Sequence, residues 1–143
     1  MQKVVTIGGA SAQLLDSVTA VEQLLAVQEL DYLVFDFLGE GSMGHLSMLS
    51  KAVPGGGFAR EFVDLHLMPH LATLLARGIR VVANAGGVDP AGCAAALRQA
   101  ADAAGLEPRI AWVEGDDLRP RIAEMRARGC RDMFDGRAFP DAI

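Results

Sequence analysis

Residues 77–105 read RGIRVVANAGGVDPAGCAAALRQAADAAG and pass from a strand to a helix. The β-branched segment Arg80–Ala83 predicts a buried strand, because short continuous apolar runs are typical of parallel sheets. Asp89 and Pro90 then begin a helix. An Asp side chain accepts hydrogen bonds from the first free amides, and Pro at the first helical position loses only an N–H without a helical partner. The helix is expected to end at Gly105, since Gly commonly terminates helices.

The same alternation of strand and helix runs along the whole chain. It predicts an α/β fold, a doubly wound (Rossmann- or flavodoxin-like) three-layer sandwich with a mainly parallel sheet of about four strands. We expect a single domain over residues 1–143, with one helix kinked or restarted at Pro69, which lacks an N–H donor. The expected strands are Lys3–Ile7, Tyr32–Phe37, Arg80–Ala83 and Arg109–Val113, and the further helices are Ser17–Gln28, Met43–Val53, Phe58–Arg77 and Leu118–Arg128.

The composition excludes several classes of protein. Of the 143 residues, 51% are hydrophobic, which excludes a disordered chain because enough apolar surface is present to form a core. The formal net charge of −5 argues against a nucleic-acid partner, and no apolar run reaches the length of a membrane span. Two cysteines form no disulfide framework and the N-terminus has no signal-peptide pattern, so a cytoplasmic location is expected.

Glycine-containing turns are expected where two of the strands end. Right-handed crossovers place the carboxyl ends of parallel strands at one edge, and ligands bind there near the point where strand order reverses. Glycines let a backbone approach a ligand, and amides at a following helix start attract anions. A purely structural turn is the alternative at both places, and the first turn, at residues 8–11, matches neither a dinucleotide nor a phosphate-loop fingerprint. The candidate ligand- or phosphate-binding residues are Gly8, Gly9, Ala10, Ser11, Asn84, Gly86 and Gly87.

Acidic side chains and one histidine follow the second strand. Asp36, Glu40 and His45 are the candidate catalytic residues, with Glu40 favoured as general acid or base. Crowded carboxylates shift one another's pKa or bind a divalent cation such as Mg²⁺. Weaker candidates for a metal site follow the fourth strand, where capping of the last helix is the alternative for the two aspartates; they are Glu114, Asp116 and Asp117.

The other reactive side chains are expected in structural roles: a surface or packing role for the two histidines and a packing role for Cys93. His66 and His70 have the i, i+4 spacing of some metal sites, but no third His or Cys is near in the sequence and Pro69 disturbs the turn between them. Cys93 lies in an alanine-rich helix face, which favours packing over a reactive thiol.

Four sequence blocks carry a resemblance to a known family. They are IGGAS at 7–11, DYLVFDFLGE at 31–40, RGIRVVANAGGVDPAGCAAAL at 77–97 and VEGDDL at 113–118. Together they resemble the N-terminal region of the acyclic terpene utilisation (AtuA-type) proteins. Members of that family are longer, and they tend to have a Gly/aromatic stretch where this chain has the more apolar Ala12–Leu15. Contact between this loop and a ligand is therefore less expected here.

The resemblance implies a soluble catabolic enzyme domain acting in the degradation of citronellol- and geraniol-type terpenes. That route passes through branched acyl-CoA thioesters, so the implied substrate is a small molecule: a branched acyl-CoA or a small carboxylate. Hydratase- or lyase-like proton transfer is the implied chemistry. The cofactor stays open: the resemblance suggests a CoA thioester as substrate, and the clustered carboxylates suggest Mg²⁺.

Two alternatives remain beside the enzyme hypothesis. The first is a non-catalytic ligand-binding or assembly domain, which needs a missing partner domain for activity. The expected protein partners are a second copy of the chain, in a homo-oligomer, or a complementary family domain. The second alternative is a flavodoxin-like redox module, which the small number of aromatic residues disfavours: Tyr32 begins an expected strand and Trp112 lies within another. Binding of CoA or nucleotides, measured together with turnover, separates these hypotheses.

Overall fold

The structure is a computed structural model that describes residues 4–138. The chain divides into two compact units, Met1–Val113 and Glu114–Ile143. The first unit contains the sheet and the longer helices, and the second contains a short 3₁₀ turn and a short helix. The single domain over residues 1–143 stays a prediction.

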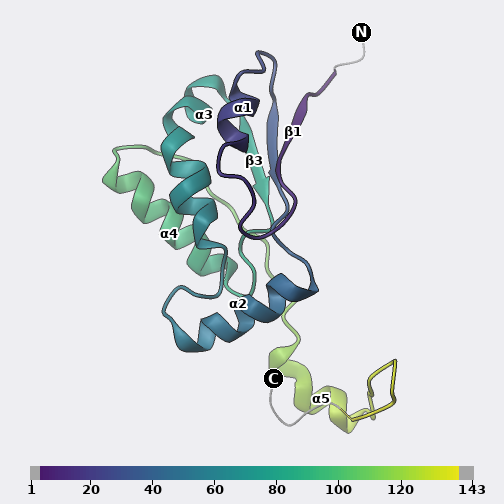
Figure 1. Cartoon of the computed structure of the whole chain (residues 1–143). Helices are drawn as coiled ribbons and strands as arrows, with labels where there is room; N and C mark the ends of the chain where they lie inside the picture. The colour runs from purple at the N-terminus through teal and green to yellow at the C-terminus, as the bar shows by residue number, and fades with distance from the viewer. Residues whose placement is uncertain (1–3, 139–143) are drawn as a thin grey trace. The chain divides into compact units, whose positions relative to one another are not determined.

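The first unit has a three-stranded parallel sheet in the order β1-β2-β3 (Figure 1). The strands are β1 (Ile7–Ser11), β2 (Tyr32–Phe35) and β3 (Arg80–Ala83). In the register, Ile7 pairs with Tyr32, and Tyr32 pairs with Arg80. The predicted α/β class and the parallel pairing are confirmed, and β3 has the bounds expected from the sequence.

The first strand lies later in the chain than expected. The prediction of a strand at Lys3–Ile7 followed by a turn at Gly8–Ser11 is wrong, because Gly8–Ser11 are themselves strand residues; Lys3 lies outside the described residues. Gly8 explains the difference: a Cβ there would lie 2.9 Å from Leu24 Cδ2 and 3.1 Å from Leu30 Cδ1. The glycine lets these leucines pack against the strand, so it does not mark a turn.

The predicted fourth strand does not form. Arg109–Val113 is irregular in the structure, although Ile110 packs against the core. Trp112 is 53% exposed and Val113 is 91% exposed, so burial does little to hold this segment against the sheet. A doubly wound, four-stranded sheet is therefore not confirmed among the described residues.

The helices follow the expected segments with shorter or shifted bounds. Pro69 lies in a 3₁₀ turn between a π-helix and an α-helix, so the break expected in Phe58–Arg77 is confirmed. The helical elements are α1 (Ala20–Leu25), α2 (Glu40–Ala52), the π-helix η1 (Phe62–Leu67), the 3₁₀ turns η2 (Met68–His70) and η3 (Arg119–Arg121), α3 (Leu71–Arg77), α4 (Pro90–Ala103) and α5 (Ile122–Ala127). No helix within residues 4–138 is long and apolar enough to cross a membrane.

Helices cover one face of the sheet. Leu33 and Phe35 of β2 are buried in a single cluster with side chains of α1, η1, α3 and α4. In Figure 1, α3 and α4 are drawn on the same side of β3. On the opposite face, Ile7 is 62% exposed and Val82 is 54% exposed. When parallel strands follow one another in sequence order, right-handed crossovers place every connection on the same face of the sheet. The order β1-β2-β3 therefore gives two layers, one of strands and one of helices, where a three-layer sandwich was expected.

Candidate functional site

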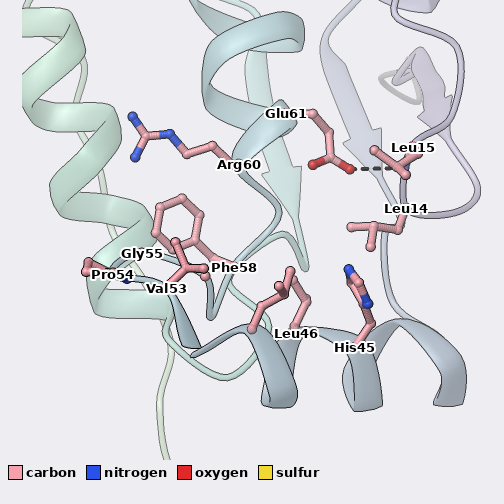
Figure 2. A pocket seen from close by; sticks show the side chains of 12 residues that line it. Leu14, Leu15, His45, Leu46, Val53, Pro54, Gly55, Phe58, Arg60 and Glu61 are labelled. Carbon is pink, nitrogen blue, oxygen red and sulfur yellow. Dashed lines mark hydrogen bonds between the residues drawn. The ribbon is translucent and has the colours of Figure 1, made fainter. Parts of the chain in front are cut away.

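A cavity of about 420 Å³ lies between the loop after β1, helix α2 and residues 53–61 (Figure 2). Its size is within the usual range for small-molecule pockets, and most of its wall is aliphatic or aromatic. Such a pocket suits an apolar ligand with one polar end. It is lined by Leu14, Leu15, His45, Leu46, Leu49, Val53, Pro54, Gly55, Gly56, Phe58, Arg60 and Glu61.

The loop after β1 is held against the opposite wall by one long-range hydrogen bond. The Leu15 amide donates to Glu61 Oε1 at 3.0 Å (Figure 2). At the start of the loop, the Ala12 amide donates to Asp16 Oδ2 at 2.9 Å, and the Asp16 carboxylate also accepts from the Ser17 amide. These backbone hydrogen bonds lower the pKa of Asp16, the bond from Ala12 contributing most. The loop is thus fixed from two sides.

Leu15 has an unusual conformation at the rim of the pocket. Its φ of +62° lies in the left-handed region, which costs a residue with a side chain about 1 kcal/mol or more. Its side chain is nevertheless 78% exposed, so burial does not compensate for this conformation. Strained residues of this kind cluster at ligand clamps and active sites. Leu15 is therefore a functional candidate that the sequence analysis missed, and the adjacent leucines in a loop were the only signal.

Three polar side chains line the pocket. Figure 2 shows the imidazole of His45 directed from α2 toward Leu14, and the carboxylate of Glu61 on the opposite wall. Arg60 is paired with Asp64, with Nε 2.9 Å from Oδ2 on an exposed surface. His45 is therefore the one predicted catalytic residue that lines this cavity.

A second group of predicted residues lies at the carboxyl ends of the three strands. Asn84 Nδ2 donates to Asp36 Oδ1 at 2.6 Å, and Ser11 Oγ donates to the Asp36 carbonyl at 3.3 Å. Asn84 Oδ1 in turn accepts from the Phe37 amide at 2.7 Å. The structure thus brings together one candidate from each of the three strand ends, as parallel pairing requires. These contacts bind the strand ends to one another.

The glycines after β3 have a structural explanation. Gly87 has φ +53°, and a Cβ there would lie 2.6 Å from both the Gly57 carbonyl oxygen and Leu46 Cδ1. At Gly86, a Cβ would lie 2.8 Å from Pro90 Cα. Both glycines therefore permit close packing of this loop. Their phosphate-binding role, and that of the glycines in β1, stays a prediction.

Glu40 and Asp89 are acidic residues at the starts of helices. Glu40 is the exposed first residue of α2, and its negative charge interacts favourably with the positive end of the helix dipole. It does not line the pocket. Asp89 caps α4, with Oδ1 accepting from the Gly92 amide at 2.9 Å, as the sequence predicted. The catalytic role of Glu40 stays a prediction.

The candidate metal ligands Glu114, Asp116 and Asp117 belong to the second compact unit. Asp117 accepts hydrogen bonds from the Arg119 side chain at 2.8 Å and from the Arg119 amide at 3.0 Å. The side-chain hydrogen bond is the main cause that lowers the pKa of Asp117. Within residues 4–138, no group of three or more His, Cys, Asp or Glu side chains is arranged to hold a metal ion.

The expected packing roles of two side chains agree with their burial. Burial raises the pKa of the Cys93 thiol to about 11, with a further contribution from the nearby Asp89 carboxylate. A thiol with this pKa is protonated near neutral pH and is a poor nucleophile. His66 is completely buried among aromatic rings of the core.

Fold and site together define a two-layer α/β protein with a small apolar pocket beside helix α2. Comparison with known families identifies the particular family: the family model described as acyclic terpene utilisation family protein AtuA matches residues 5–142. The chain belongs to this family, and the resemblance noted from the sequence is confirmed. No curated protein and no solved structure matches the chain.

Proposed function

We propose that this protein acts in acyclic terpene utilisation by binding the branched hydrocarbon chain of a terpenoid acid, or of its CoA thioester, in the pocket beside α2. The observation that carries the proposal is the cavity itself: a largely apolar wall with the His45 imidazole in it. Family membership supplies the class of compound, and the aliphatic lining supplies the physical reason for its binding.

Proton transfer by His45 is the chemistry that we propose for this pocket. A hydratase or lyase step next to a carbonyl needs a group that removes a proton and returns one, and histidine is the most common such group. In the hydration direction, the base takes a proton from water, the oxygen bonds to the β-carbon, and the α-carbon receives a proton. Asp36 and Glu40 do not line the pocket and stay sequence-based candidates for the second proton-transfer group.

Calorimetric titration tests the binding part of this proposal. A branched C10 acid such as geranic acid is expected to bind more tightly than straight-chain decanoic acid, because family membership indicates branched terpenoid compounds as the ligand class. Leu15→Gly is expected to weaken binding about fivefold, through the loss of apolar contact worth about 1 kcal/mol. Val18→Gly is the matched control, because Val18 is also an exposed apolar residue but does not line the pocket. Equal loss in both variants would contradict the proposed binding site.

An assay with the branched acyl-CoA tests the chemical part. His45→Gln is expected to lower turnover by about a hundredfold or more, while ligand affinity stays nearly unchanged. Glu40→Gln and Asp36→Asn, measured in parallel, identify the second proton-transfer group by a similar loss. Unchanged turnover in His45→Gln removes this residue from the mechanism.

A ligand-binding or assembly domain without catalysis is the second candidate function. The observation that favours it is the uncovered apolar face of the sheet, where Ile7 and Val82 are more than half exposed. Binding of the branched acid without any turnover by the isolated chain would support this candidate over the enzyme.

A further inference from the structure

One face of the sheet in the first unit carries apolar side chains that the described residues, 4–138, leave exposed. The residues that alternate with the buried side of each strand are Ile7 and Gly9 on β1, Tyr32 and Val34 on β2, and Arg80 and Val82 on β3. Ile7 and Val82 are 62% and 54% exposed. Parallel sheets are almost always covered on both faces, so an uncovered one marks an interaction surface.

Opposite charges border this face at its two ends. Arg80 is at the amino end, where its guanidinium carbon lies 5.6 Å from the centre of the Tyr32 ring and its Nη1 donates to the Tyr32 hydroxyl at 2.7 Å. Asp36 directly follows β2 at the carboxyl end; it is exposed and continues the alternation of Tyr32 and Val34. Its Oδ1 accepts hydrogen bonds from the Asn84 side chain and the Leu38 amide, so the proposed contact with a second copy uses Oδ2. Asp36 is four residues after Tyr32 along the strand, which corresponds to about 13 Å. Val34 and its neighbours across the sheet, Gly9 and Val82, form an apolar row midway between these two charged ends.

This order of charges makes the face complementary to itself. A two-fold axis in the interface, perpendicular to the strands, reverses the strand direction of the second sheet. The apolar row of Gly9, Val34 and Val82 then meets the same row of the second copy. At both ends of the interface, Arg80 of one copy then faces the end of the sheet that carries Asp36 of the other copy. Arg80 is on β3 and Asp36 follows β2, so the two residues are offset by one strand spacing of about 4.8 Å, which an arginine side chain spans. The opposite choice, with the strands running in the same direction, would place like charges together.

We propose that a second copy of this chain covers this sheet face, in an isologous dimer with antiparallel strands across the interface. The dimer buries Ile7, Val34 and Val82 and pairs Arg80 of each copy with Asp36 of the other. It supplies the third layer that the order β1-β2-β3 leaves open within one chain.

Sedimentation equilibrium of the full chain at micromolar concentration tests the apolar part of the interface. The unchanged chain is expected to be a dimer, and Val82→Glu to weaken dimerisation at least tenfold. Leu75→Glu is the matched control: Leu75 is a 41%-exposed leucine on α3, so this variant is expected to remain a dimer. Circular dichroism verifies the fold of each variant. The proposal is overturned if the unchanged chain is folded but monomeric. This holds whether its sheet face is then bare or is covered by another protein or by other residues of the same chain. A Val82→Glu variant that dimerises normally also overturns it.

A charge exchange tests the antiparallel arrangement. Arg80→Glu alone places two carboxylates together at each end of the interface, and Asp36→Arg alone places two guanidinium groups together. Each single variant is therefore expected to weaken the dimer at least tenfold. The double variant pairs the exchanged charges and is expected to recover most of this loss. A double variant as weak as the single variants overturns the proposed pairing.

Discussion

His66 is the residue whose position in the core is energetically most unusual. Its side chain is fully buried, and neither ring nitrogen has a hydrogen-bond partner. The ring packs against Phe35 and Phe37, with ring centres 5.6 Å apart in both contacts. Burial lowers the pKa of His66, and this effect outweighs the attraction of the Glu61 and Asp16 carboxylates. The imidazole is therefore neutral in the folded protein, and its protonation opposes folding.

The lowered pKa of His66 predicts loss of stability in mild acid. The unfolded imidazole has a pKa of about 6.5 and binds protons more strongly than the folded one, so the free energy of unfolding falls as pH falls below about 6.5. We expect His66→Leu to remove most of this pH dependence and to raise stability at pH 8 by about 1 kcal/mol, because two unsatisfied polar atoms leave the core. Urea unfolding between pH 8 and 5 measures both effects.

His70→Gln is the control for this experiment. His70 lies only one turn further along the chain but is not fully buried, so this variant is expected to keep the pH dependence of the unchanged protein. An unchanged pH dependence in His66→Leu would show that another group causes the acid sensitivity.

At the scale of elements, α4 is the helix that the sequence defines best. Its start at Pro90, the cap by Asp89 and its end before Gly105 follow the expected signals, which all act within a few residues. We expect Asp89→Ala to lower the free energy of unfolding by about 1 kcal/mol, because the Gly92 amide loses its acceptor. Asp102→Ala in the last turn of the same helix is the control and is expected to leave stability unchanged or slightly higher. Equal losses in chemical denaturation would contradict the capping role.

Elements that depend on distant contacts were predicted less well. Two adjacent glycines at 8 and 9 are typical of a turn, yet they lie in β1 because leucines from α1 and the following loop need the space beside Gly8. The segment Arg109–Val113 has the residues of a strand but not its pairing. The local sequence predicts neither the strand at the two glycines nor the missing pairing of Arg109–Val113, because both depend on which distant residues lie beside the segment.

At the scale of the whole molecule, the site was predicted in part. The rule that carboxyl ends of parallel strands meet correctly brought together Ser11, Asp36 and Asn84. It did not predict the pocket, whose walls come from the loop after β1, helix α2 and residues 53–61. Leu15 reaches that pocket through a hydrogen bond to Glu61, 46 residues away, and nothing in the spacing of either residue indicates the contact.

We propose that the pocket beside α2, and not the cluster of polar residues at the strand ends, binds the branched chain of a terpenoid acid. Titration of the ¹⁵N-labelled protein with geranic acid, followed by amide chemical shifts, tests it most directly. We predict saturable shifts at Leu15, Leu49 and Gly55, which line the pocket. Shifts concentrated at Asp36 and Asn84, or no saturable shift anywhere, would contradict the claim.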